Sequence, residues 1–100
     1  MDIETIKQKT APVFGKFGVQ RAGLFGSFAR GDATNKSDMD FVVSFRSNSD
    51  ASDIRVLTGL KEKLEDTLGR RVDLSQYANL KRRFRPYIIS EQIIIYDEKD

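Results

Sequence analysis

The chain has 100 residues, of which 39% are hydrophobic and 32% charged, with a formal net charge of +2. This size and composition predict a single soluble domain over residues 1–100, and no apolar run approaches the ~20 residues of a membrane span. Cysteine and histidine are both absent, which excludes disulfides, thiolate nucleophiles, Ser-His-Asp triads and most transition-metal sites. Carboxylates, hydroxyls, lysine and backbone amides remain, and they suit hard cations such as Mg²⁺. We expect a cytoplasmic protein, because the N-terminus lacks the basic and then apolar layout of a signal peptide.

Hydrophobic periodicity and turn residues predict alternating helices and strands. In chain order, the expected elements are a helix over residues 2–17, a strand over 19–25, a tight turn into a brief helix within 26–31, a strand over 38–45, a helix over 54–68, a strand over 71–76, a helical stretch over 78–90 and a strand over 93–96. Pro12 should divide or kink the first helix, because it lacks an amide proton and crowds the preceding turn. Ser27 should cap the second helix, and Gly31 and Gly69 should end the second and third helices. This order predicts an α/β (α+β) fold, a small mixed sheet with helices packed mainly on one face.

Two neighbouring features carry the chemistry. The turn Gly26-Ser27 offers backbone amides and a hydroxyl to phosphate oxygens, and Gly26 lets them approach because it has no side chain. Asp38 and Asp40 stand at i and i+2 of a predicted strand, so their Cα atoms lie about 7 Å apart and both carboxylates share one face. They can converge on a cation. Asp73, an acid between apolar strand residues, is the best candidate for the third carboxylate of a two-metal site.

Each of these features has a plainer interpretation. The turn alone could be an ordinary helix start, and the aspartate pair could be solvated, although like charges on one face repel without a cation. Asp73 could face solvent or pair with Arg71. Arg30 could steer phosphates or lie on a helix surface. The basic segment Lys81–Arg85 could be a solvated helix face or a docking patch for an acidic partner or RNA.

Three runs match the motifs of a known family. They are Leu24-Phe25-Gly26-Ser27-Phe28-Ala29-Arg30-Gly31, Ser37-Asp38-Met39-Asp40-Phe41-Val42-Val43 and Val72-Asp73-Leu74. On these runs the chain resembles the minimal nucleotidyltransferases of the DNA polymerase β superfamily. The likeness spans nearly the whole chain and implies the nucleotidyltransferase (polymerase β-like) fold, with ATP as the usual donor.

The resemblance also implies residue roles. Gly26 and Ser27 would bind the β- and γ-phosphates, and Asp38 and Asp40 would ligate two Mg²⁺ ions. Asp73 would ligate one of these ions and help to activate the acceptor hydroxyl. Small members of the family act as antitoxins beside a helical HEPN-type toxin, and some adenylylate a tyrosine of that partner. We therefore expect a hetero-oligomeric or homo-oligomeric antitoxin.

Two other functional classes stay open. The protein could keep the fold and the metal site but neutralise its partner by occlusion alone. It could also bind nucleic acid through the basic segment, although the net charge is modest and no aromatic stacking platform is interleaved with the arginines. Size favours a separate acceptor protein, because 100 residues leave no second domain to hold one.

Overall fold

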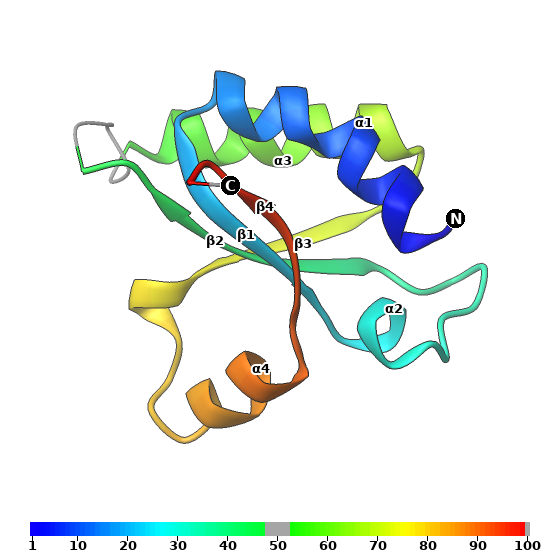
Figure 1. The fold of residues 1–100 in the computed structure, drawn as a ribbon. Helices are drawn as coiled ribbons and strands as arrows, with labels where there is room; N and C mark the ends of the chain where they lie inside the picture. Colours follow the sequence, from blue (N-terminus) through cyan, green and yellow to red (C-terminus); the bar gives the residue numbers. More distant parts are fainter. Residues whose placement is uncertain (48–52, 100) are drawn as a thin grey trace.

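The computed structural model describes residues 1–47 and 53–99 (Figure 1). In chain order the elements are α1 (Ile3–Lys16), β1 (Val19–Phe25), α2 (Ser27–Arg30), β2 (Met39–Phe45), α3 (Ile54–Leu68), β3 (Val72–Gln76), the 3-10 helix η1 (Tyr77–Asn79), α4 (Arg85–Glu91) and β4 (Ile93–Asp97). Within these residues the strands form one four-stranded sheet in the order β3-β2-β1-β4. The pair β2–β3 is parallel, and the pairs β1–β2 and β1–β4 are antiparallel. The predicted mixed sheet is therefore confirmed.

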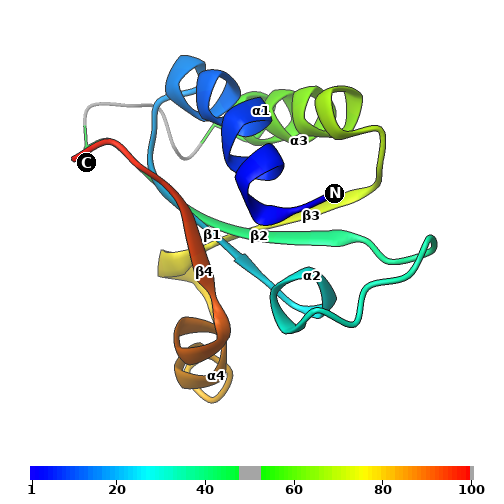
Figure 2. The ribbon, with the colours of Figure 1, turned by 45° about the vertical axis from the view of Figure 1, so that its right-hand side comes forward.

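The two long helices cover one face of the sheet. Figures 1 and 2 show α1 and α3 side by side above the strands, with α2 and α4 on the opposite side. The core lies beneath α1 and α3, where Phe14, Leu64, Leu24 and Phe41 are fully buried. The rings of Phe14 and Phe41 meet edge to face with centroids 5.8 Å apart, a geometry that adds about 0.5–1.5 kcal/mol beyond burial. The opposite face of the sheet, on the side of α2 and α4, is not covered by a long helix.

Pro12 neither divides nor ends the first helix, since α1 continues through it as one element. Its missing amide would have bonded to the carbonyl of Gln8. Both residues are exposed, so water can reach that carbonyl. The helix is capped by Asp2, the residue before its first turn, whose carboxylate accepts a hydrogen bond of 2.8 Å from the amide of Thr5.

The cap of α2 was predicted wrongly. The N-cap residue is Gly26, which has no capping side chain, and Ser27 is the first helical residue. The ends of the helices were predicted correctly, because Gly31 and Gly69 close α2 and α3 in the left-handed conformation, with φ of 85° and 64°. No described helix is both long enough and apolar enough to cross a membrane.

The helical stretch expected over residues 78–90 is shorter than predicted. It consists of η1, a turn and α4, and α4 begins only at Arg85. Pro86 explains this start. A proline in the first turn of a helix loses nothing, because its missing amide proton would have had no partner inside the helix. Pro86 therefore starts a helix here instead of lying in its middle.

Candidate nucleotidyl-transfer site

The turn between β1 and α2 lies directly against the aspartate strand. Gly26 has φ 75° and ψ −153°, and a Cβ added there would collide with the Oδ2 atom of Asp40. The preceding residue, Phe25, pairs with Asp40 in the β1–β2 register. Glycine is therefore favoured for two reasons, its positive φ with an extended ψ, which other residues rarely adopt, and the close approach of the turn to Asp40.

The hydrogen-bond donors of the Gly26-Ser27 turn differ in whether the chain already supplies an acceptor for them. The amide of Gly26 donates to Oε1 of Glu91 at 2.7 Å. The amide and the hydroxyl of Ser27 have no hydrogen-bond partner in the described part of the chain, and this residue is only half-buried. Free amide and hydroxyl donors side by side suit phosphate oxygens. In this structure the donors open to a ligand are therefore those of Ser27, while Gly26 allows the turn to reach Asp40.

Three aspartates gather where β2 and β3 run parallel. Asp40 stands opposite Asp73 in the strand register, and Asp38 immediately precedes β2. Burial raises the pKa of Asp40 above its ordinary 3.8, and the charges of Asp73 and then Asp38 raise it further. The Arg30 guanidinium acts in the opposite direction, and Glu91 adds a small upward contribution to the pKa of Asp40. The predicted acids therefore share one electrostatic environment.

Oxygen donors of this kind fit a hard divalent cation. The excess of negative charge around Asp40 is relieved by a cation, which lowers the cost of keeping the group ionised. As the side chains lie, residues 1–47 and 53–99 contain no group of three or more carboxylates arranged around a common metal position. One reason is visible: Asp38 pairs with Arg71 at 3.7 Å, with 46% and 83% of the two side chains exposed. An exposed pair of this kind contributes about 0–1 kcal/mol, so Asp38 can turn toward a metal at little cost.

Arg30, the last residue of α2, lies between the Gly26-Ser27 turn and Glu91 at the end of α4. Its guanidinium pairs with Asp32 at 3.4 Å and with Glu91 at 3.3 Å, and its side chain is half exposed. The hydrogen bond and charge of Asp32, with a smaller contribution from Glu91, raise the pKa of Arg30, which stays positively charged. A cation placed here can attract a phosphate.

Glu91 is the functional candidate that the sequence patterns missed. It stands at the end of α4, 65 positions from the glycine whose amide it accepts. The contact depends on the antiparallel pairing of β1 with β4, which brings the end of α4 to the turn. No local pattern around Glu91 signals this, because the residues that meet it lie far away in the chain.

Comparison with known proteins defines the class. Residues 7–100 match the family model described as polymerase beta, nucleotidyltransferase. A candidate protein adenylyltransferase of Methanocaldococcus jannaschii is 37% identical over 93 residues, which cover 93% of this chain and 97% of the relative. The protein adenylyltransferase MntA of Thermococcus cleftensis is 35% identical over 80 residues, which cover 80% of this chain and 78% of the relative.

Solved structures agree on the fold. A structure described as a candidate minimal nucleotidyltransferase superposes with a TM-score of 0.76 at 34% identity, covering 93% of this chain and 95% of the other. A tri-AMPylated Shewanella oneidensis HEPN toxin in complex with an MNT antitoxin gives a TM-score of 0.71 at 18% identity, covering 95% and 72%. At that identity the second likeness shows the fold alone.

The chain therefore belongs to the polymerase β nucleotidyltransferase family. It is a nucleotidyltransferase of minimal size, and its relatives bear the name protein adenylyltransferase. The predicted class and fold are confirmed, while the roles of the individual site residues stay predictions.

Proposed function

We propose that the protein transfers AMP from ATP to a hydroxyl group of a separate partner protein, as the cytoplasmic antitoxin of a HEPN-type toxin. The observation that carries the proposal is the placement of Asp40 opposite Asp73, beside Asp38 and the free donors of Ser27. The names of the relatives support the reaction. The fold neighbour bound to a HEPN toxin supports the partner class.

The triphosphate binds along the turn. The amide and hydroxyl of Ser27 donate to oxygens of the β- and γ-phosphates, and Arg30 adds a positive charge. Gly26 contributes by its lack of a side chain, which keeps this turn against Asp40. The α-phosphate then faces the three carboxylates.

Asp38, Asp40 and Asp73 would hold the Mg²⁺ ions that nucleotidyl transfer uses. When bound, Mg²⁺ neutralises charge on the triphosphate and polarises the attacking oxygen. The residues of the chain supply the ligands and the orientation. Asp73 is exposed, so an acceptor from outside can reach it.

The reaction is an in-line displacement at the α-phosphorus. A bond forms between the acceptor oxygen and the α-phosphorus, and the bond from that phosphorus to the bridging oxygen of the β-phosphate breaks. Pyrophosphate leaves toward Ser27 and Arg30. The proton of the acceptor hydroxyl passes to the carboxylate of Asp73 and from there to water.

The acceptor must be oriented by its own protein. Correct placement of two reactants supplies several kcal/mol of barrier lowering. The core of this chain comes from α1, α3 and the sheet, and we propose that the partner protein contributes to the orientation of its own hydroxyl. A tyrosine of a HEPN-type toxin is the acceptor that we propose.

Mass spectrometry tests the reaction. The purified HEPN-type partner, incubated with this protein and Mg²⁺-ATP, should gain one or more AMP units. The Asp38→Asn, Asp40→Asn double variant should leave its mass unchanged. If wild type and double variant inhibit the toxin equally, with no mass change in either case, the protein neutralises its partner by occlusion and the transfer proposal fails.

A further inference from the structure

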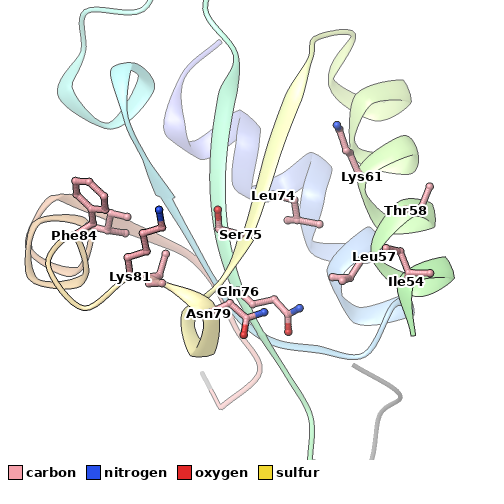
Figure 3. Close-up of a pocket in the computed structure, with 12 residues that line it drawn as sticks. Ile54, Leu57, Thr58, Lys61, Leu74, Ser75, Gln76, Asn79, Lys81 and Phe84 are labelled. Atoms are coloured by element: carbon pink, nitrogen blue, oxygen red, sulfur yellow. The ribbon is translucent and has the colours of Figure 1, made fainter. Parts of the chain in front are cut away.

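A groove runs along the outer edge of β3, between α3 and the segment that follows β3 (Figure 3). We call it the β3 groove. It has a volume of about 580 Å³, and its apolar lining comes from Ile54, Leu57, Leu74, Leu80, Phe84 and Ile88. Because β3 is the last strand of the sheet on this side, no described strand covers it.

Apolar side chains at the groove are left in water. Ile54 is 72% exposed and Phe84 is 46% exposed. Leaving large apolar side chains uncovered forgoes about 25 cal/mol for each Å² that could be buried, and contiguous patches of this kind mark interaction sites. The groove is therefore suited to an apolar segment of another molecule.

The charges of the groove select among such segments. Lys61 and Lys81 line it from opposite walls, and none of the described residues that line it carries a carboxylate (Figure 3). The guanidinium of Arg83 lies 4.7 Å from the ring centroid of Phe84 and adds positive charge at the rim. A segment that combines apolar side chains with carboxylates complements both properties.

The groove adjoins the transfer site. Ser75 lines the groove and follows Asp73 by two residues, so the two residues lie on the same face of β3 with Cα atoms about 7 Å apart. Ser27 stands at the far side of the site, beyond the end of β1, and β2 lies between β1 and β3. A segment in the groove would thus approach Asp73 from the side away from the triphosphate.

We propose that the β3 groove docks an acidic amphipathic segment of the acceptor protein and so brings its hydroxyl group to Asp73. This inference rests on the proposed function for the identity of the acceptor. It assigns the basic segment Lys81–Arg85 a role in docking through Lys81, Arg83 and the neighbouring Phe84.

The test compares charge reversal inside and outside the groove. The variants are Lys61→Glu with Lys81→Glu, and the matched control Lys9→Glu with Lys63→Glu, which changes the net charge equally at exposed lysines that do not line the groove. Association with the immobilised HEPN-type partner is measured at low and moderate salt. The groove variant should associate about tenfold more slowly at low salt and lose most of the salt dependence, while the control stays within about twofold of wild type.

A second variant examines the apolar contact without altering charge. Ile54→Ser with Phe84→Ser should speed dissociation from the partner about tenfold, because exposed apolar anchors act mainly on the dissociation rate. Both side chains are exposed in the chain alone, so folding should persist, and circular dichroism with Mg²⁺-ATP titration confirms it. Nucleotide affinity should stay within about twofold of wild type.

The outcomes separate docking from transfer. The Asp38→Asn, Asp40→Asn variant should bind the partner as wild type does, even if no AMP is ever transferred. If both groove variants bind the partner at the same rates as the wild-type protein, the docking proposal is overturned and the transfer proposal is unaffected. Weaker Mg²⁺-ATP binding by the groove variants would show a nucleobase site instead. A wild-type dimer in solution that the groove variants convert to monomer would show a second copy of this chain in the groove.

Discussion

The two sides of β3 offer opposite environments within a few residues. Asp73 and Asp38 are exposed and lie near the half-buried Asp40, whose pKa is raised by burial and then by the charges of these two neighbours. Leu74, the next residue, lines an apolar groove whose charged side chains are the lysines Lys61 and Lys81. Because successive strand residues point to opposite faces, one short strand can serve two surfaces of different chemistry.

The difference between the three aspartates and the β3 groove shows how a small chain can place nucleotide binding and partner binding on separate surfaces. In the two proposals, Asp38, Asp40 and Asp73 hold Mg²⁺ and face the triphosphate, while the β3 groove takes an acidic amphipathic segment of the partner. Changes on one side of the strand should therefore leave the function of the other side intact, and the following predictions examine that separation.

The largest effect should come from the third carboxylate. Asp73→Asn should preserve folding and partner binding yet cut AMP transfer about 100-fold or more, because the amide cannot accept the hydroxyl proton and is a poor ligand for a hard cation. The measurement is the rate of AMP incorporation into the partner, with Asp66→Asn on the exposed surface of α3 as control. Transfer at the wild-type rate would remove Asp73 from the site.

The next largest effect should come from a substitution in the Gly26-Ser27 turn, measured as a loss of stability. Gly26→Ala should lower the free energy of unfolding by about 2–4 kcal/mol, from the left-handed φ and the collision with Asp40. Gly31→Ala is the reference variant for a positive φ. Gly31 has φ 85° and ψ 13° in the left-handed region, and nothing lies within 4 Å of its added Cβ, so only a conformational cost of about 1 kcal/mol applies. Gly26 has ψ −153°, in a region that glycine alone adopts readily, so both its backbone conformation and the approach of Asp40 enlarge the loss. Equal losses in urea denaturation of the two variants would contradict the close approach at Gly26.

A smaller effect should follow from the glutamate at the turn. Glu91→Gln keeps an acceptor for the Gly26 amide but removes a negative charge beside Arg30. Mg²⁺-ATP affinity should rise about threefold, the size expected for one unit charge several ångströms away in a largely aqueous setting. Calorimetric titration measures this. A lower affinity would mean instead that the charge of Glu91 holds Arg30 in its binding orientation.

The smallest effect is a dependence of stability on pH. The pKa of Asp40 in the folded protein lies above its ordinary 3.8. Protonated Asp40 is therefore favoured by folding. This contribution to the free energy of unfolding is fully present below the pKa of Asp40 in the unfolded chain, and it is lost as pH rises through the pKa in the folded protein. In Mg²⁺-free buffer, Asp40→Asn should gain stability relative to wild type across this window. Mg²⁺ should reduce this difference in the free energy of unfolding between Asp40→Asn and wild type, because it favours ionised Asp40. A difference that does not change with pH would refute the raised pKa.

Local patterns predicted most of the fold. β1, β2, α3 and β3 follow from periodicity, and the glycines that end α2 and α3 follow from their freedom to adopt positive φ. At Pro12 the sequence allowed two short helices or one kinked helix, and the structure has one continuous helix, α1. The exposure of Pro12 and Gln8, which permits this continuity, depends on which face of the helix meets solvent.

The contact of Glu91 and the β3 groove could not be predicted, since each joins segments far apart in the chain. The roles of the candidate site residues stay predictions, and the sequence alone could not show which hydrogen-bond donors of the turn already have a partner in the chain. In the structure the Gly26 amide is bonded to Glu91, and the donors of Ser27 are left for a ligand.

The most direct measurement is a crystal structure of the protein with Mg²⁺ and a non-hydrolysable ATP analogue. We expect the β- and γ-phosphates within hydrogen-bond distance of the Ser27 amide and hydroxyl, metal density among Asp38, Asp40 and Asp73, and an open β3 groove. A nucleotide seated in the β3 groove, with no metal at the three aspartates, would contradict both the assigned site and the separation of the two surfaces.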